Sequence, residues 1–150
     1  EVLGPEPFDD WNAKIAAAKC RGKRSPIKTT LLDQRFVVGV GNIYACEALH
    51  NAGISPTKLA AKLVTKSGKP TKALEKLVDE VKIVLKKAIA AGGSTLNDFA
   101  DVDGNLGYFS HHFTIYGRED QPCLKAGCSG TVERIVQSNR STFWCPRCQK

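Results

Sequence analysis

Two pairs of cysteines near the end of this 150-residue chain have a spacing that suits metal coordination. Four residues separate Cys123 from Cys128, sixteen residues follow, and two residues separate Cys145 from Cys148. Four thiolates presented by two tight turns form the usual ligand set of a structural, tetrahedral zinc site. The alternative is a pair of disulfides, which the absence of a secretory signal disfavours. We therefore predict one structural Zn²⁺.

A second candidate site is the glycine turn Gly39-Val40-Gly41-Asn42. A dinucleotide-binding fold would require a third glycine at position 44, where this chain has Tyr44, and a longer apolar strand before the turn. That fold is therefore excluded. The glycines still let the backbone approach an anion, and the N–H groups that start a helix at Asn42 carry partial positive charge. The turn thus predicts a phosphate contact.

The charge of the chain favours a polyanionic partner. The net charge is +7, with seven bases against one acid in residues 14–35 and nine lysines against three acids in residues 58–87. A lysine-rich helix face exposed to solvent would explain the second block without any partner. Two basic regions around an anion-binding turn, however, favour nucleic acid. No apolar run approaches 18 residues, so we expect no membrane span.

Capping residues and apolar periodicity predict that the first part of the chain is helical. The first two predicted helices are PFDDWNAKIAAAKCRG, with Asp9 as its cap, and SPIKTTLLDQ, with Ser25 as its cap and Pro26 at its first position. The next two are Asn42–Ala52, ended by Gly53, and SPTKLAAKL. The last is a long helix ended by Gly92-Gly93, whose apolar positions are Leu74, Leu77, Val78, Val81, Leu85, Ala88 and Ile89. Cys20 and Cys46 fall on helices as free thiols, and His50 is expected on a helix surface.

The pattern changes in the last third of the chain. Residues 92–112 lack periodicity, and the segments FTIYG, TVERIV and STFW then read as strands. We predict a mainly α fold with a small β appendage, divided near residue 112.

The motifs, taken in order, resemble the C-terminal half of the bacterial formamidopyrimidine-DNA glycosylase family. The segment IKTTLLDQRFVVGVGNIYACEALHNAGISP is similar to the helix-two-turn-helix region of that family. GGSTLNDF, FTIYGRED and RSTFWCPRCQK are similar to its later segments and its zinc finger. The resemblance implies a helix-two-turn-helix DNA-binding domain over residues 1–112, which includes a lesion-recognition loop at about 92–108, and a four-cysteine β-hairpin zinc finger over residues 113–150.

The resemblance also implies roles for particular residues. Asn42, with Gly41 before it, would hold a backbone phosphate beside the lesion, and Tyr116 would contact another phosphate. Lys28 would lie on the DNA-facing surface, and Lys23 or its neighbour Arg24 would add a contact. Arg140 would contact the phosphates that flank a flipped nucleotide and donate a proton in δ-elimination. The alternatives are that Asn42 only caps its helix and that Arg140 is a solvated charge. Ser94, Thr95 and Asn97 would belong to the lesion-recognition loop.

Two positions depart from the family pattern. The first cysteine pair has four intervening residues instead of the common two, so its turn must differ. Asn97 stands where relatives often carry lysine or arginine, which puts recognition of the damaged base in doubt.

The family's chemistry depends on a part that this chain lacks. The resemblance implies an N-terminal proline whose amine attacks the damaged nucleotide, followed by a glutamate and assisted by a lysine of a β-sandwich domain. This chain begins Glu1-Val2. We therefore expect the DNA-gripping part of a base-excision-repair glycosylase and AP lyase that removes oxidised purines, inactive by itself. Its expected partners are damaged double-stranded DNA and the missing N-terminal domain, in a monomeric parent protein of the bacterial cytoplasm associated with the nucleoid.

Three other interpretations remain open at this point. They are the endonuclease VIII branch of the same superfamily, a stand-alone zinc-ribbon module that binds nucleic acid, and a structural zinc protein with an incidental basic surface.

Overall fold

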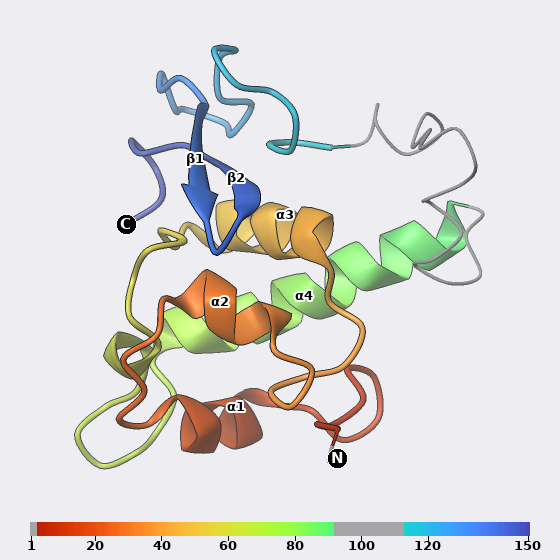
Figure 1. The fold of residues 1–150 in the computed structure, drawn as a ribbon, viewed down its shortest axis with the longest axis vertical. Coiled ribbons are helices and arrows are strands. Elements are labelled where there is room, and N and C mark those ends of the chain that lie inside the picture. The colour runs from red at the N-terminus through yellow and green to blue at the C-terminus, as the bar shows by residue number, and fades with distance from the viewer. Residues whose placement is uncertain (1–2, 92–112) are drawn as a thin grey trace.

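A computed structural model of the chain describes residues 3–91 and 113–150. The elements in chain order are α1 (Ala13–Cys20), α2 (Ile27–Leu32), α3 (Asn42–Ala52), the 3₁₀ helix η1 (Ala60–Leu63), α4 (Lys72–Ala90), β1 (Glu133–Gln137) and β2 (Arg140–Trp144). Figure 1 shows that α3 lies between the other helices and the β-hairpin. The predicted mainly α fold with a four-cysteine β appendage is confirmed. The boundary near residue 112 falls next to the part outside the described residues, and it stays a prediction.

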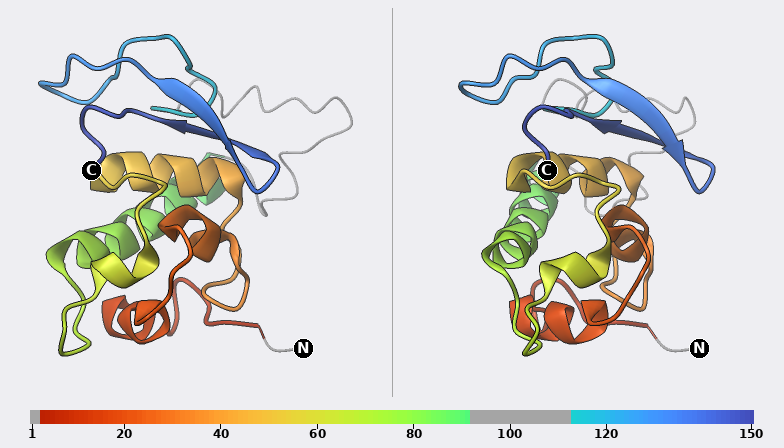
Figure 2. Two further views of the ribbon diagram at one scale, coloured as in Figure 1. Left: turned by 60° about the vertical axis from the view of Figure 1, so that its left-hand side comes forward. Right: turned by 90° about the vertical axis from the view of Figure 1, so that its left-hand side faces the viewer.

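Helix α3 is buried on two sides. All residues from Tyr44 to His50 are buried, which a helix lying at the surface of a single layer cannot achieve. One side contributes Ala45, Ala48 and Leu49 to the large helical core. The opposite side contributes Cys46 to a second, smaller core inside the finger. The views in Figure 2 agree that the hairpin covers the side of α3 that faces away from α1. Its predicted bounds, Asn42–Ala52 with Gly53 in the left-handed conformation as its C-cap, are confirmed.

Helix α4 places its predicted apolar positions in the helical core. Leu74, Leu77, Val81 and their periodic neighbours are buried, and the Thr71 side chain caps the helix by accepting from the Leu74 N–H at 3.2 Å. The exception is Ile89, which was predicted to belong to the same stripe and is 51% exposed. The last turn of α4 extends past α3 (Figure 1), so nothing in the described chain covers the Ile89 side chain.

The predicted helix starts are wrong at three places. Helix α1 is capped by Asn12, whose side chain accepts from the Ile15 N–H, and not by Asp9. Helix α2 begins at Ile27 with Pro26 as its N-cap residue, so Ser25 is not the cap. The segment SPTKLAAKL forms only the short helix η1. One contact explains the later starts of both α2 and η1. The chain before α2 pairs with the chain before η1, and the Ile27 N–H donates to the Lys58 carbonyl at 2.7 Å.

The finger contains one antiparallel hairpin in its described residues. Strands β1 and β2 pair from Glu133↔Trp144 to Gln137↔Arg140. Ser138 and Asn139 form the turn with φ of 51° and 66°, the backbone of a two-residue type I′ hairpin turn. The segment FTIYG, predicted as a strand, is not one. The backbone N–H groups of residues 114–116 donate to the Glu47 carboxylate of α3, which leaves them unavailable to a sheet.

Candidate zinc centre and nucleic-acid interface

The four cysteines predicted to bind zinc lie together. Their Sγ atoms are all within 4.8 Å of one another. Cys123 Sγ is 3.8 Å from Cys148 Sγ, and Cys128 Sγ is 3.7 Å from Cys145 Sγ. A tetrahedral zinc ion with Zn–S bonds of about 2.3 Å places its ligand sulfurs about 3.8 Å apart, so these residues fit one Zn²⁺. None of the four forms a disulfide. The predicted structural zinc site is confirmed.

The environment of the thiols shows why a cation is needed among them. Burial, and then the neighbouring cysteines, raise the pKa of Cys148 to about 12, and burial also raises the pKa of Cys123. Cys128 has a lowered pKa, because the Gly130 backbone N–H donates to its sulfur. The thiols of Cys123 and Cys148 therefore stay protonated near neutral pH unless a metal supplies positive charge. Zinc binding should release protons and hold the finger together.

The finger is attached to the C-terminal end of α3 by polar contacts. Lys125, from the loop between Cys123 and Cys128, donates to the His50 carbonyl at 2.8 Å. Such a cation complements the partial negative charge of a helix C-terminus. Gln149 donates to the Ile54 carbonyl at 2.9 Å, and the Lys150 N–H donates to the Gly53 carbonyl. The longer first cysteine loop thus places a residue that fastens the finger to the helical body.

His50 is the side chain of α3 that reaches the zinc centre. It is 2% exposed. Its Nε2 lies 3.3 Å from Cys123 Sγ, and its Nδ1 lies 3.1 Å from Thr114 Oγ1. Burial, and then the positive charges of Lys125 and Arg118, lower the pKa of His50 to about 4, so the ring is neutral near pH 7. The prediction of a helix-surface histidine is wrong, because the finger covers this face of α3.

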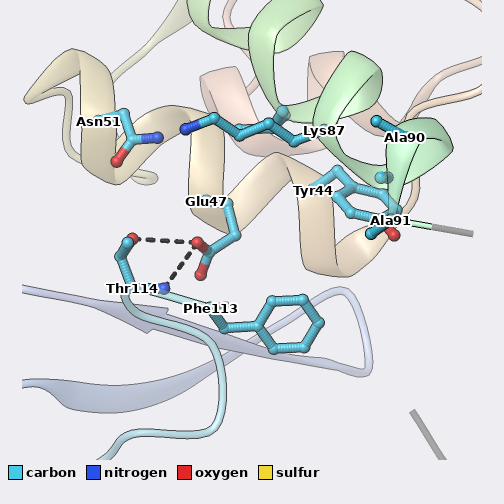
Figure 3. Close-up of a pocket in the computed structure, with 10 residues that line it drawn as sticks. Tyr44, Glu47, Asn51, Lys87, Ala90, Ala91, Phe113 and Thr114 are labelled. Carbon is cyan, nitrogen blue, oxygen red and sulfur yellow. Dashed lines mark hydrogen bonds between the residues drawn. The ribbon is translucent and has the colours of Figure 1, made fainter. Parts of the chain in front are cut away.

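Glu47, one turn before His50, holds the start of the finger. Its carboxylate accepts from the N–H groups of Thr114, Ile115 and Tyr116 at 2.8–2.9 Å and lies 3.0 Å from the Thr114 hydroxyl oxygen. Figure 3 shows this carboxylate pointing from α3 to Thr114. A buried carboxylate with this many donors is fully satisfied, and it fixes the path of the chain as it enters the finger.

Beside Glu47 lies a cavity of about 380 Å³ between α3, α4 and the first described residues of the finger. Tyr44, Val84 and Phe113 form apolar walls, and Asn51 and Lys87 add polar groups at one end (Figure 3). The cavity also borders Ala90 and Ala91, directly before the residues that the structure does not describe. It belongs to the junction between the helical body and the finger.

On the opposite end of α3, three segments converge on the start of β2. The Asn42 side-chain amide donates to the Ser141 carbonyl at 2.9 Å, which uses one of its two hydrogens. The Lys28 ammonium donates to Thr142 Oγ1 at 2.6 Å and lies 3.4 Å from the Ser141 carbonyl oxygen. These contacts join α2, α3 and β2. Asn42 Oδ1 has no hydrogen-bond partner in the described chain.

Lys28 differs from the surface cation that was expected. Its side chain is 1% exposed, and burial, together with the Arg140 charge, lowers its pKa, although the nearby Cys46 acts in the opposite direction. The ammonium is already bonded to Thr142 and Ser141. In this structure Lys28 therefore holds strand β2 of the hairpin against α2, and a direct contact with DNA stays a prediction.

Arg140 stands at the outer end of this junction. It is exposed, at the first position of β2 and next to the type I′ turn. Helix α3 begins nearby with Gly41 as its N-cap, and no side-chain hydrogen bond caps that end. An exposed guanidinium and an uncapped helix N-terminus carry the same sign of charge, and both bind anions. The structure thus brings Gly41, Asn42 and Arg140 into one region.

The other predicted contacts lie elsewhere or outside the described residues. Tyr116 packs edge-on against Phe143, with ring centroids 4.7 Å apart, and is partly exposed. Lys23 lies in the turn after α1, and within the described residues no hydrogen bond joins it to Asn42 or Arg140. Ser94, Thr95 and Asn97 of the predicted lesion-recognition loop fall outside the described residues, so their roles stay predictions.

Sequence reasoning missed Glu47, His50 and Lys125 as residues that organise the site. A signal was present for two of them. Glu47 and His50 are three residues apart on α3, which places them on one face of a helix that is otherwise apolar there. Two polar side chains on the same buried face indicate a polar partner across from them, which here is the finger.

Two family models match the chain. The formamidopyrimidine-DNA glycosylase H2TH domain matches residues 3–100, and the zinc finger found in FPG and IleRS matches residues 120–150. Among curated proteins, a formamidopyrimidine-DNA glycosylase of Rhodopseudomonas palustris strain BisB18 is 52% identical over 99% of this chain, and one of Sinorhizobium fredii is 54% identical over 99%. The chain spans about half the length of these relatives, 51% and 50%.

Solved structures of similar shape agree with these matches. A MutM in complex with DNA containing carbocyclic 8-oxo-G is 33% identical, with a TM-score of 0.79 over 99% of this chain and 51% of that one. A Lactococcus lactis Fpg in complex with DNA containing an abasic site is 32% identical, with a TM-score of 0.79 over 99% and 52%. Separately, none of the helices in the described part of the chain has the length and apolar character needed to cross a membrane.

Proposed function

Because the chain belongs to the formamidopyrimidine-DNA glycosylase family, we propose that it is the DNA-gripping half of a bifunctional glycosylase and AP lyase. The substrates of the whole enzyme are oxidised purines, 8-oxoguanine and formamidopyrimidines, in double-stranded DNA. The relatives at 52% and 54% identity carry the formamidopyrimidine name, which supports this branch over endonuclease VIII.

The observation that carries the proposal is the convergence of α2, α3 and β2 below Arg140. Asn42 and Lys28 both hold the Ser141 carbonyl, so the strand that presents Arg140 is fixed to two helices. The zinc centre fixes the other end of the same strand at Cys145. A guanidinium held in this way loses little entropy when it binds phosphate, and its fork matches two phosphate oxygens.

In this proposal each residue has a distinct task. Gly41, the second amide hydrogen of Asn42 and the N-terminus of α3 bind the phosphate beside the lesion. Arg140 binds the phosphates that flank the flipped nucleotide and donates a proton in δ-elimination. Tyr116 and Lys23 add phosphate contacts. Lys28 supports the hairpin through its bonds to Thr142 and Ser141 and keeps a third ammonium hydrogen for a DNA phosphate. Phosphate contacts of this kind position the protein and do not read sequence.

The nucleophile of the reaction belongs to the other half of the enzyme. The family mechanism uses an N-terminal proline amine, and the prolines of this chain are internal, with their nitrogens in peptide bonds. The 150-residue polypeptide alone should therefore bind DNA without cutting it. In the bacterial cell the whole enzyme would act as a monomer on nucleoid DNA, and it must rotate the damaged nucleotide out of the stack to reach it.

The test joins this chain to the N-terminal half of the Rhodopseudomonas relative and measures nicking of a duplex with one 8-oxoguanine. The joined protein should nick the damaged strand, and the chain alone should not. Preference for an oxidised pyrimidine would assign the endonuclease VIII branch instead. Nicking by the chain alone would contradict the assignment of the nucleophile to the other half of the enzyme. A joined protein that neither binds nor nicks DNA would favour the interpretation as a structural zinc protein.

A further inference from the structure

We propose that His50 is a positioning residue of the zinc centre. Its Nε2–H donates a hydrogen bond to the Cys123 thiolate and so holds one zinc ligand against α3. The helical body, and not the finger alone, would then determine how tightly the metal is bound. The inference rests on the zinc centre and is independent of any activity on DNA.

The geometry defines which atom carries the hydrogen. His50 Nε2 and Cys123 Sγ are 3.3 Å apart, and both side chains are buried. A zinc-bound thiolate has no proton, so the hydrogen between these atoms must belong to Nε2. In a neutral ring this leaves Nδ1 bare, 3.1 Å from Thr114 Oγ1, so the single hydroxyl hydrogen of Thr114 must turn from Glu47 Oε1, 3.0 Å away, to Nδ1. This tautomer gives Cys123 a donor and Nδ1 a partner, and Glu47 keeps the three backbone N–H donors of residues 114–116.

The orientation of the ring is fixed from α3 itself. Thr114 is held by Glu47, which accepts from its N–H at 2.8 Å and lies 3.0 Å from its hydroxyl oxygen. Glu47 and His50 come from the same helix, one turn apart. The chain Glu47–Thr114–His50 therefore directs Nε2 toward Cys123 without any flexible link.

The charge of the site gives this bond a purpose. One Zn²⁺ with four thiolates carries net negative charge, and Cys123 and Cys145 are buried where water cannot neutralise it. N–H donors to the sulfurs compensate that charge. Cys128 receives such a bond from the Gly130 N–H at 3.4 Å, within the finger. For Cys123, His50 is the side-chain donor, and it comes from outside the finger.

The decisive experiment compares zinc affinity in two variants of the 150-residue chain by competition with a chromophoric chelator. His50→Phe keeps a planar ring of similar size without a donor, and it should weaken zinc binding by roughly tenfold to a hundredfold. His50→Gln, whose amide can donate to the sulfur, should recover part of the loss. The matched control is Lys125→Ala, which removes the contact of the finger with the His50 carbonyl and leaves the Nε2–Sγ pair in place.

Lys125→Ala should reduce zinc affinity much less than His50→Phe; equal losses would mean that docking of the finger, and not the sulfur contact, accounts for the effect. Two spectroscopic measurements complement the affinities, and the first of them needs no variant. In the zinc-loaded chain, ¹H–¹⁵N spectra should show a slowly exchanging hydrogen on Nε2 of His50. In the cobalt-loaded chain, His50→Gln should shift the thiolate-to-cobalt absorption. A hydrogen on Nδ1 alone, or unchanged zinc affinity in His50→Phe, would overturn the proposal.

Discussion

Arg140 occupies an exposed position beside a carbonyl that two helices hold. The Ser141 carbonyl accepts from Asn42 at 2.9 Å and faces the Lys28 ammonium at 3.4 Å. The side chain of Arg140 therefore projects from a fixed backbone, and its removal should affect a bound phosphate without disturbing the fold. Asn42 is itself a candidate ligand, but it also supports the strand, so its substitution would mix the two effects.

We predict that Arg140→Ala, in the enzyme restored to full length, weakens binding of damaged duplex by about 1–3 kcal/mol. Zinc content and thermal unfolding should not change. Arg140→Lys should recover only part of the loss, because an ammonium cannot fork across two oxygens. Nicking should fall together with binding, since a poorly seated phosphate leaves the nucleotide out of reach. Fluorescence anisotropy and a gel assay measure both, and normal values in the alanine variant would make Arg140 a solvated charge.

Gly130 gives a second prediction about a single residue. A Cβ atom at this position would lie 2.5 Å from Cys145 Sγ and 2.8 Å from Arg147 Cβ. Gly130→Ala should therefore displace a zinc ligand and destabilise the finger by about 1–3 kcal/mol. The measurement is zinc retention during dialysis against a weak chelator. Gly41→Ala is the control, because nothing lies within 4 Å of its added Cβ and its φ of −92° suits any residue. Equal zinc retention in the two variants would contradict the prediction.

At the scale of elements, α3 is shared by two cores. Its bounds could be predicted from the sequence because Gly41 and Gly53 are local signals. Which segment buries Glu47, His50 and Lys28 could not be predicted, since the finger that covers them begins more than sixty residues later in the chain. The same long-range contact explains why FTIYG is not a strand. Its N–H groups donate to Glu47, and no local sequence pattern predicts that acceptor. The cysteine site was predictable because its four ligands lie in two short, regularly spaced pairs.

We predict that Glu47→Gln separates the finger from α3 more than it disturbs either part alone. The glutamine amide turns an NH₂ group toward backbone donors that need an acceptor. The cost of losing charged acceptors and leaving a buried donor unpaired is about 1.5–3 kcal/mol. Urea unfolding followed by tyrosine and tryptophan fluorescence measures this cost. Glu75→Gln, on the exposed first turn of α4, is the matched control and should change stability little.

Removal of zinc should act on one core and spare the other. The smaller core contains Cys123 and Cys145 together with Ile115, Val132 and Phe143. The larger core is built from the helices and contains none of the zinc ligands. Chelation should therefore unfold residues from about 113 onward, while the far-ultraviolet circular dichroism of the helices persists. Hydrogen exchange resolves the two regions, and simultaneous loss of protection in α4 and β2 would show that the cores unfold as one.

At the scale of the whole molecule, the net charge of +7 determines how strongly DNA binding by the chain depends on salt. The chain alone should bind duplex weakly and distinguish 8-oxoguanine from guanine little, because phosphate contacts position a protein without reading bases. An increase in salt from 50 to 200 mM should weaken binding by about tenfold or more if several phosphates are neutralised. Arg140→Ala should lower the slope of log affinity against log salt by about one. Strong discrimination by the chain alone would place lesion recognition within it.

The attachment of the finger to α3 limits how freely these enzymes can exchange parts. A finger transplanted from a relative at residues 113–150 would arrive without the helix surface that completes it. Glu47 would meet a foreign entry segment, His50 would meet a different sulfur or none, and the end of α3 would lose the Lys125 ammonium. The unit that evolution or a protein engineer can swap intact is therefore the finger together with the outer face of α3, although that unit is discontinuous in the chain.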